Sequence, residues 1–537
     1  LVLAAPPGPD MAAHVYQRGL FAHHGLLLWD NRWYDGRYAF VTYSALYYPL
    51  AALVGIKVLA VLSAAGMSGG YALAALGRLG RRARPSVWLG ALGDGALVLG
   101  SAFPFLLGAA FGAAALALVA LPAGPARAGG REGRLAWPRQ AGFALAAAAC
   151  LAASPLAFLG LGIVVAALVV SRPARARPLA VPIGVLGVLA LAEAVLMRLF
   201  ADYGHYPFWS QDLVTLLVLC AAVSAVASRS SAGRPIVAGA GLLALTGLAA
   251  FAIPSDLGAN VDRVRDIALP VVALAVALAR WRPRWLVVPV LLAAAVWEAW
   301  PLASAWSAGA AGGHDDRTSY WAPAVAYLRQ HLSPSFRVEA VDPAGHWPAA
   351  WLAGAGIPLV RGWYRQDDFP ANALLYRSGP LAPAAYLAWL RGQGVAYVVL
   401  SDAPADFSAT GEEGLVRSGG SGLRLVLAAA HVSVYAVPAP EPIVVGPAPA
   451  PVTRLTEQSL TTAPRAAGSY RIALHWSPYW RTSRGCVTAA AGGMTELVLR
   501  APGPGPVTLS LGPTPATLLG ALSGASAPRC GGPGGGS

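Results

Sequence analysis

The stretch FLLGAAFGAAALALVALP, residues 105–122, decides the fold class of this chain. It contains no charged side chain, and an apolar helix of about 20 residues crosses the hydrocarbon core of a bilayer. Similar stretches lie on both sides of it. The first of them is too long for one crossing, so residues 43–49 are expected in the membrane interface. Ten spans are predicted in all, at residues 44–76, 86–102, 105–122, 140–153, 155–171, 178–199, 212–228, 235–253, 267–280 and 285–303.

The composition excludes a soluble enzyme and a disordered protein. Hydrophobic residues make up 56% of the 537 residues, charged residues make up 12%, and the mean hydropathy is +0.55. Ordinary soluble domains carry roughly 25% charged residues, so this chain lacks the polar side chains to cover a globular surface. We therefore expect a polytopic α-helical membrane protein with more polar parts attached.

The arginines predict how the chain crosses the membrane. The net charge is +14, and alternate loops between the spans hold sixteen arginines and one acid, Glu132. The positive-inside rule places these loops in the cytoplasm. Residues 1–43, 200–211, 254–266 and 304–537 then lie outside. The basic charge is thus mostly a topology signal, and a nucleic-acid partner is not expected. The arginines are Arg78, Arg81, Arg82, Arg84, Arg127, Arg131, Arg134, Arg139, Arg172, Arg175, Arg177, Arg229, Arg234, Arg280, Arg282 and Arg284.

The start of the chain is expected to be an outer loop with interfacial helices, residues 1–43. Leu1 to Ala5, followed by Pro-Pro-Gly-Pro, is typical of the last turn of a span. Two interpretations stay open: a helix precedes Leu1, or the mature protein begins with a short N-terminus.

The polar C-terminal part is expected to hold two extracytoplasmic domains. Residues 304–437 predict an α/β module with helices at 318–332 and 383–393, strands at 336–340 and 395–400, and a hairpin at 423–437. A Pro-rich linker then leads to a predicted β-sandwich, residues 438–530, and residues 531–537 are expected to be a flexible tail. Cys486 and Cys530 bracket the sandwich on the oxidising side, which favours a disulfide between them.

The outer loop contains the densest group of polar and aromatic residues. Asp10 and His14 are four residues apart, so a helix starting near Pro9 puts them on one face. Asp10 has a structural interpretation as the cap of that helix. Farther on come Trp29, Asp30 and Arg37. The aromatic side chains of this group could stack on a sugar ring or anchor the chain in the interface.

These residues carry a resemblance to a known family. The layout resembles the GT-C superfamily of integral membrane glycosyltransferases, in having a long outer loop with an early acidic residue, many spans and a C-terminal outer domain. In detail, short motifs resemble YfhO-like bacterial membrane proteins. The motif residues are Asp10, His14, Gly25, Trp29, Asp30, Trp33, Gly36, Arg37, Tyr47-Tyr48-Pro49-Leu50 and Ala102 to Gly108.

The resemblance implies transfer of a sugar from a polyprenyl-phosphate donor to a cell-envelope glycan or lipid, at the outer face of a bacterial plasma membrane. An outer-loop carboxylate would be the general base, and Asp10 matches that position. A lipid phosphate needs cations there, and Arg263 and Arg265 precede the span at 267, where a helix N-terminus adds its dipole. The alternative for both arginines is a local pair with Asp262 or Asp266. His205 could line the same cavity or be an ordinary surface histidine.

The α/β module contains a second candidate loop, with Arg361, Trp363 and Arg365 beside two carboxylates. This loop could bind a carbohydrate acceptor or dock the module onto the membrane part. The segment from Trp476 to Trp480 is either a glycan-binding stretch or an apolar core strand. No metal ligand motif is found, so a divalent cofactor is possible without being indicated.

Two other functions stay open. One is a non-catalytic envelope-assembly protein on the same fold, in which Asp10 would be buried and satisfied. The other is a transporter or flippase, which would use intramembrane carboxylates such as Asp94 and Glu193. The chain shows no inverted repeat, the usual mark of a transporter.

Overall fold

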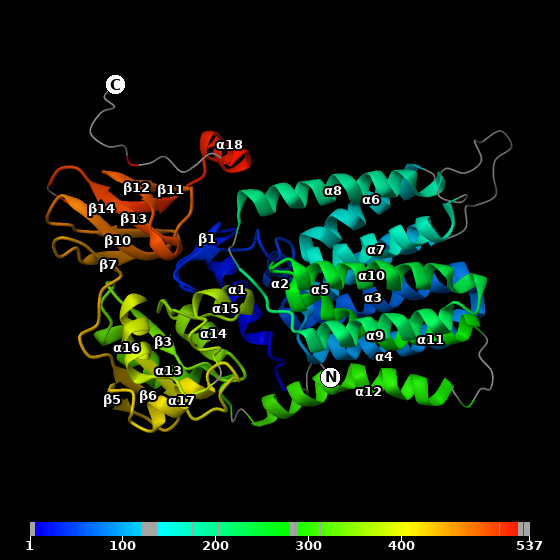
Figure 1. The fold of residues 1–537 in the computed structure, drawn as a ribbon, viewed down its shortest axis with the longest axis horizontal. Coiled ribbons are helices and arrows are strands. Elements are labelled where there is room, and N and C mark those ends of the chain that lie inside the picture. The colour runs from blue at the N-terminus through cyan, green and yellow to red at the C-terminus, as the bar shows by residue number, and fades with distance from the viewer. Residues whose placement is uncertain are drawn as a thin grey trace. The chain divides into compact units, whose positions relative to one another are not determined.

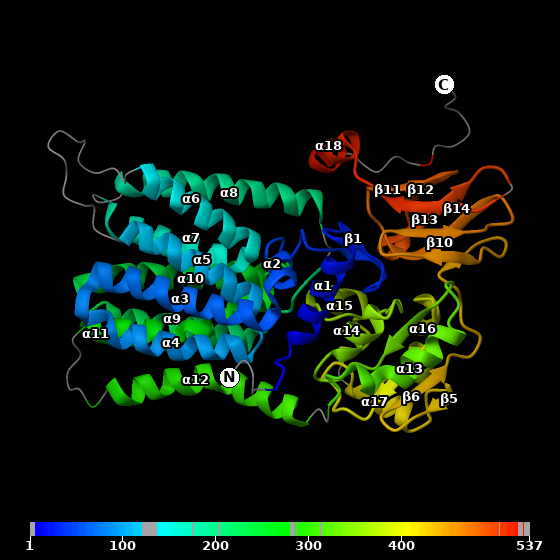
Figure 2. The same ribbon diagram turned by 180° about the vertical axis from the view of Figure 1, so that it is seen from behind.

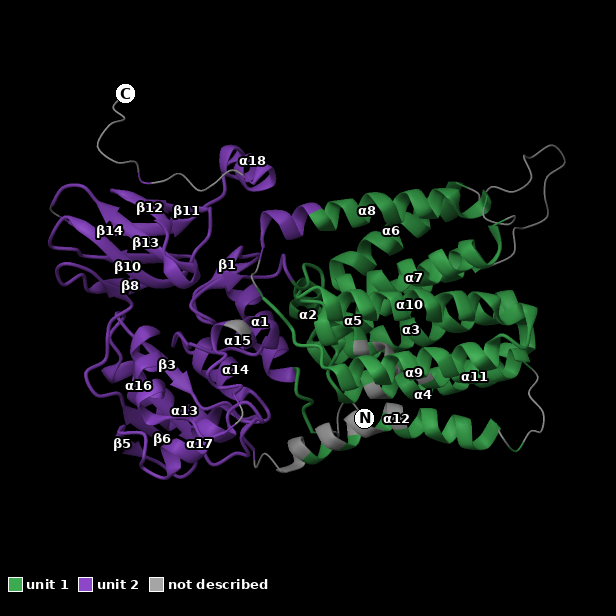
Figure 3. Cartoon of the chain, viewed as in Figure 1, with its two compact units in different colours: residues 1–10, 43–194, 204–309 green, residues 11–42, 195–203, 310–537 purple. Residues whose placement is uncertain are grey.

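The computed structural model describes residues 6–120, 137–173, 177–201, 204–279, 285, 287–311, 314–377, 379–503, 505–524 and 530. The arginines expected at 127–134, 175 and 280–284, the start of the chain at residues 1–5 and the tail at 531–537 lie outside these residues. The described chain divides into two compact units, shown in Figure 3: residues 1–10, 43–194 and 204–309 form one, and residues 11–42, 195–203 and 310–537 form the other.

The first unit is a bundle of apolar helices (Figures 1 and 2). Each predicted span contains a helix. These are α3 (Ile56–Leu79), α4 (Arg84–Leu99), α5 (Phe103–Ala120), α6 (Trp137–Ala153), α7 (Pro155–Ser171), α8 (Ala180–Leu199), α9 (Ser210–Ala227), α10 (Arg234–Ala252), α11 (Ala268–Ala279) and α12 (Val287–Ala311). The predicted first span is broken at Gly55, where φ is +88°, so a short helix α2 (Tyr47–Val54) precedes α3.

Within the described residues, five segments are long and apolar enough to cross a membrane: Ile56–Leu99, Phe103–Ala120, Arg177–Leu199, Ser210–Ala227 and Ser231–Ala252. The first of these contains both α3 and α4. Shorter apolar helices lie at Pro155–Ser171, Leu269–Ala279 and Val287–Val296. The number of crossings therefore stays a prediction.

Small residues let the helices of this bundle approach closely. A Cβ atom on Gly70 of α3 would lie 2.9 Å from backbone and side-chain atoms of Ala113 on α5. A Cβ atom on Gly108 of α5 would lie 2.8 Å from the Cβ of Ala157 on α7. Close packing of this kind holds helices together in lipid, where the hydrophobic effect gives little drive.

The second unit contains an α/β module. Its sheet has the order β3-β4-β6-β5, with β3 parallel to β4 and the other pairs antiparallel. The strands are β3 (Arg337–Ala340), β4 (Val395–Ser401), β5 (Arg424–Ala428) and β6 (Val432–Ala436); the helices are α13 (Thr318–His331), α14 (Trp347–Gly354), α15 (Arg365–Ala371), α16 (Pro383–Gly392) and α17 (Thr410–Arg417).

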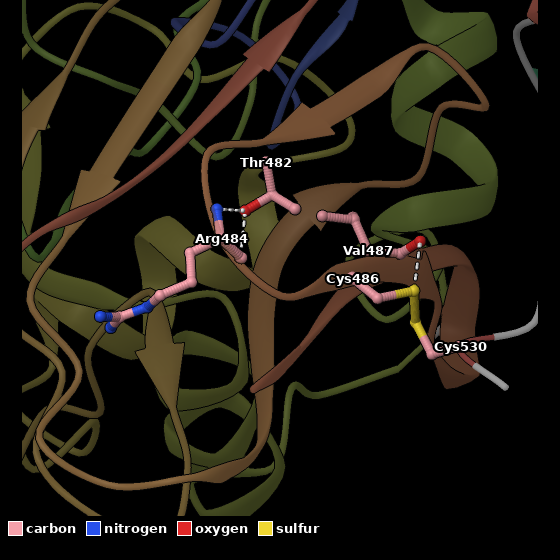
Figure 4. Close-up of a disulfide and its surroundings, with 5 residues drawn as sticks. All are labelled: Thr482, Arg484, Cys486, Val487 and Cys530. Carbon is pink, nitrogen blue, oxygen red and sulfur yellow. Dashed lines mark hydrogen bonds between the residues drawn. A yellow bond between two sulfur atoms is a disulfide. The ribbon is translucent and has the colours of Figure 1, made fainter. Parts of the chain in front are cut away.

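A β-sandwich follows in the same unit. One sheet has the order β12-β13-β10-β7 and the other β11-β14-β9-β8. The strands are β7 (Val444–Val445), β8 (Val452–Leu455), β9 (Ser459–Thr462), β10 (Gly468–His475), β11 (Trp480–Thr482), β12 (Cys486–Ala489), β13 (Met494–Leu499) and β14 (Val507–Leu511), and helix α18 (Pro515–Ser523) comes last. Cys486 and Cys530 are joined by a disulfide, next to the turn in which Thr482 Oγ1 donates to the Arg484 carbonyl (Figure 4).

The N-terminal segment also belongs to the second unit. It forms α1 (Met11–His24) and a short hairpin of β1 (Trp29–Asp30) and β2 (Arg37–Tyr38). Trp29 and Tyr38 lie in the hydrophobic core of the sandwich. Arg337 of β3 forms a buried ion pair with Asp35 at 3.0 Å. The segment before the first span is therefore packed as part of the C-terminal domains. The predicted fold class, a polytopic helical membrane protein with an α/β module and a β-sandwich, is confirmed.

Candidate functional site

An ion pair between Asp10 and Arg263 is the centre of the candidate site in the first unit. The Nη2 atom of Arg263 lies 3.2 Å from Oδ2 of Asp10, although 253 residues separate them along the chain. The Asp10 side chain is only 8% exposed, and the Arg263 side chain is 27% exposed. The sequence had suggested each residue separately. The structure adds that they meet.

Asp10 is held in place by the turn between α4 and α5. Gly8 packs so closely against this turn that a Cβ atom there would lie 2.2 Å from the Leu99 carbonyl oxygen. The turn itself contains Ser101 in the left-handed region, with φ at +58°. Asp10 follows two residues after this contact and directly precedes α1. The apolar helices thus fix the backbone that carries the carboxylate.

Arg263 lies on a 3₁₀ segment, η5 (Gly258–Ile267), which leads directly into α11. Val261 anchors this segment in a buried cluster with Leu216 of α9 and Ala240 of α10. Its first residue, Gly258, is pressed against the Tyr206 carbonyl, and Tyr206 donates its backbone N–H to Ser255 at 3.1 Å. His205 therefore lies on the loop that packs against the start of η5. The side chains of Asp262, Arg265 and Asp266 lie outside the described residues.

The prediction that Trp29 stacks on a sugar ring or anchors the chain in the membrane interface is wrong. Trp29 is buried in the sandwich core, where its indole N–H donates to Asn31 at 2.8 Å. Trp33, from the same motif, is also buried, and its indole N–H donates to the Ala349 carbonyl at 3.0 Å. Neither ring is available to stack on a sugar or to sit in a membrane interface, because both are buried within the C-terminal domains.

The polar partners of that motif also serve internal contacts. Asp30 is buried and accepts hydrogen bonds from the Tyr16 hydroxyl and the Arg32 backbone N–H, each at 2.9 Å. Burial raises the pKa of Asp30 to about 6. Arg37 pairs with Asp367 at 2.5 Å and lies over the Tyr364 ring. His14 is fully buried in α1, within the second unit. The prediction that Trp29, Asp30 and Arg37 bind a ligand is therefore wrong, because all three side chains are buried in internal contacts. For His14, ligand binding stays a prediction.

The loop at 361–368 is a buried ionic network. Arg361 is held by Asp368 through two hydrogen bonds, at 3.0 and 2.8 Å, and also donates to Ser408. Arg365 makes two hydrogen bonds to Asp406, at 3.0 and 2.6 Å. These pairs lie within the α/β module, so Arg361 and Arg365 are structural here. Trp363 is half-buried, with His346 and Tyr364 at its edges.

The network contains carboxylates that the sequence had not singled out. Glu339 of β3 and Glu412 of α17 are buried with Arg361, and Tyr386 donates to Glu412 at 2.7 Å. Burial raises the pKa of both glutamates, and the Glu412 carboxylate adds to the rise at Glu339. Alternation along the predicted strand 336–340 puts Glu339 on the face opposite Val338, so no sequence signal marked this carboxylate as buried.

The segment from Trp476 to Trp480 belongs to the core. Tyr479 is fully buried, Trp480 is nearly so, and Trp476 packs against the same cluster. The apolar interpretation of this stretch is therefore the correct one.

Two features bear on the other functions. Asp94 of α4 is buried and accepts a hydrogen bond from Ser68 of α3, while Glu193 of α8 is half-buried. Among the residues that the structure describes, no cluster of three or more His, Cys, Asp or Glu side chains could hold a metal ion.

Comparisons with known proteins complete this description. No family model matches the chain. No curated protein matches it either. Solved structures with a similar fold include the arabinofuranosyltransferase AftD from Mycobacteria, 19% identical with a TM-score of 0.45 over 81% of this chain and 40% of AftD. ArnT from Cupriavidus metallidurans, bound to undecaprenyl phosphate, is 15% identical with a TM-score of 0.37, over 81% of this chain and 94% of ArnT.

A third similar structure is the Archaeoglobus fulgidus oligosaccharyltransferase, 13% identical with a TM-score of 0.43, over 74% of this chain and 65% of that one. The chain thus spans about two fifths of AftD. These similarities concern the fold alone, and the undecaprenyl phosphate was found bound to ArnT.

Proposed function

We propose that this chain is a glycosyltransferase that moves a sugar from a polyprenyl-phosphate donor to a cell-envelope glycan or lipid. The reaction would take place at the outer face of a bacterial plasma membrane, with the C-terminal domains extracytoplasmic. The observation that carries the proposal is the Asp10–Arg263 pair, a carboxylate and a guanidinium held together at one end of a bundle of apolar helices. The motif resemblance to GT-C and YfhO-like membrane proteins supports the same assignment.

The two side chains suit the two ends of the reaction. The acceptor oxygen would form a bond to the anomeric carbon while its proton passes to Asp10. The bond from that carbon to the phosphate oxygen would break, and its electrons would leave with the polyprenyl phosphate. Arg263 would stabilise the charge that develops on this phosphate, as a charge-assisted hydrogen-bond donor. A single displacement of this kind inverts the configuration at the anomeric carbon.

In the resting site, the Arg263 guanidinium contacts the Asp10 carboxylate at 3.2 Å. A donor phosphate would compete for the guanidinium, whose side chain is the more exposed of the two. Donor binding would then release the carboxylate for the acceptor.

A binding experiment tests the proposal before the sugar is known. Undecaprenyl phosphate is titrated into the full chain in nanodiscs and detected by native mass spectrometry. Arg263→Gln should weaken binding because it removes a cation, while Asp10→Asn should leave binding equal or tighter because it removes a competing anion. Asp212→Asn and Arg234→Gln are matched controls on α9 and α10, and should change nothing.

A transfer assay then tests catalysis. With a panel of polyprenyl-phosphate sugars and envelope glycan acceptors, Asp10→Asn should lower turnover about 10²-fold or more, the usual contribution of a general base. Equal turnover of Asp10→Asn and the native chain would rule out Asp10 as the base.

The second candidate is the non-catalytic envelope-assembly protein. The observation in its favour is that Asp10 is largely covered and paired. On this hypothesis neither Asp10→Asn nor Arg263→Gln alters lipid-phosphate binding, and both lower the stability of the helix bundle.

A further inference from the structure

Helix α18 (Pro515–Ser523) presents apolar side chains in two directions. On one side, Leu518 and Ala521 pack against the core of the β-sandwich. On the other side, Leu519 is 67% exposed and Leu522 is 41% exposed. The helix sequence, PATLLGALS, contains no charged residue. An ordinary surface helix has polar side chains on the face that the core does not cover.

The position of this helix is well fixed. Thr514 and Thr517 form a capping box at its start, with Thr517 donating its backbone N–H to Thr514 at 3.1 Å. Beyond its end, the chain returns to the sandwich through the disulfide between Cys530 and Cys486. The exposed leucines are thus held in place and are not part of a loose end.

The end of a candidate membrane span lies next to α18 in the same unit. A Cβ atom on Gly524, the residue after α18, would lie 2.9 Å from Nη2 of Arg198, near the end of α8. Residues 195–203 cluster with the second unit, as the purple end of α8 in Figure 3 shows. They are attached to the sandwich because Tyr479 donates its hydroxyl to the Leu199 carbonyl at 2.6 Å and packs against Phe200.

The last turns of α8 are themselves apolar and exposed. Val195, Leu196 and Met197 are all exposed, and Met197 is 56% exposed. They belong to the segment Arg177–Leu199, which is long and apolar enough to cross a membrane. Arg198 ends this apolar run, at the level where long cationic side chains reach from a span to lipid headgroups.

We propose that α18 and the last turns of α8 form one lipid-contacting surface, whose partner is the interfacial layer of the bilayer. Leu519 and Leu522 would enter the boundary between headgroups and acyl chains, and Arg198 would meet the phosphates beside them. Uncharged α18 would contribute apolar contact, as interfacial helices do. The surface would hold the β-sandwich at the membrane. This inference does not depend on the proposed reaction.

Spin labelling tests where the two leucines lie. Single cysteines replace Leu519 or Leu522 in a full chain whose Cys150 and Cys220 are alanine and whose disulfide is kept. Each carries a nitroxide, and the protein is placed in nanodiscs that contain anionic phospholipid. Leu425→Cys is the matched control, because Leu425 is an exposed leucine on β5 of the α/β module.

The expected result is a several-fold greater collision rate with oxygen than with a water-soluble nickel complex at positions 519 and 522, and the reverse at 425. Water-like behaviour at 519 and 522 would overturn the proposal. Low accessibility to both probes would also overturn it, because a second copy of the chain or another protein would then cover the leucines.

A second measurement uses the native chain, so that a failure of a labelled variant to fold leaves the proposal testable. A phospholipid with a photoreactive group at the top of its acyl chain is cross-linked in nanodiscs, and the modified peptides are mapped by mass spectrometry. Modification should be found in the peptide that carries α18 and be missing from the one that carries β5. An unmodified α18 peptide, with modification elsewhere in the spans, would overturn the proposal.

Discussion

Asp10, the residue before α1, forms an ion pair at 3.2 Å with Arg263, which lies on η5 just before α11 and 253 residues farther along the chain. Each side chain is positioned by a separate part of the helix bundle: Asp10 by the turn between α4 and α5, and Arg263 by the packing of Val261. Because the two residues are positioned by separate packing contacts, the fold brings their side chains together, and the attraction between the charges is not needed for this. A preorganised site requires such positioning.

A double-mutant cycle measures how strongly the pair is coupled. Asp10→Asn, Arg263→Gln and the double variant are compared by thermal unfolding in detergent. Because the guanidinium is partly exposed, the coupling should be about 1 kcal/mol, near the upper end for exposed pairs. A coupling near zero would show that the pair does not stabilise the helix bundle, contrary to this prediction.

Trp29 should matter for stability and not for ligand binding. Trp29→Ala removes a buried indole from the sandwich core and should cost about 3–5 kcal/mol. Half-buried Trp363 gives the control, since Trp363→Ala removes less buried surface and should cost less. Both variants are compared by thermal unfolding of the full chain. If Trp29→Ala leaves the melting temperature unchanged, the N-terminal hairpin is not part of the sandwich core.

The helices and strands could be predicted from the sequence, but the tertiary contacts between them could not. The helix predicted at 318–332 is α13, and the hairpin predicted at 423–437 is β5 and β6, because periodicity and turn residues are local signals. Trp29 was misinterpreted for the opposite reason. An aromatic residue before a span looks the same whether it meets lipid, sugar or a sandwich core formed more than 400 residues later.

The same limit applies to the candidate site. Asp10 and Arg263 could be predicted one at a time, from an acid after Pro-Gly-Pro and from an arginine just before a predicted span. Their meeting depends on how α4, α5, α9 and α10 pack, which no short motif records. Arg361 and Arg365 were expected to bind a carbohydrate acceptor or to dock the module, yet they form ion pairs with Asp368 and Asp406 inside the module.

Asp30 makes the stability of the second unit depend on pH. Its pKa rises from an ordinary value of 3.8 to about 6 because it is buried. The folded state therefore binds the proton of Asp30 more tightly than the unfolded state does. The stability gained from this tighter proton binding is fully present below about pH 4 and is lost as the pH rises through about 6. Over that window Asp30 should lower the free energy of unfolding by about 2–3 kcal/mol.

Unfolding of the native chain and of Asp30→Asn at pH 4, 5, 6 and 7 isolates this effect. The amide keeps the size of the side chain and an oxygen that can accept the Arg32 N–H. The difference in stability between native chain and variant should change in favour of the variant as the pH rises. A difference that stays constant across the window would contradict the raised pKa.

The disulfide should hold α18 against the sandwich, because it closes a loop with a sequence separation of 44 residues that contains β13, β14 and α18. Loop-closure entropy predicts that its loss costs the chain about 4 kcal/mol. The Cys486→Ser/Cys530→Ser variant should therefore melt at a lower temperature, and protease should cut sooner after β14. Cys150→Ala/Cys220→Ala is the matched control, since it removes two buried free cysteines and leaves the disulfide in place. If both double variants are cut at the same rate as the native chain, then the packing of Leu518 and Ala521 is enough to hold α18, and the disulfide is not what fixes it.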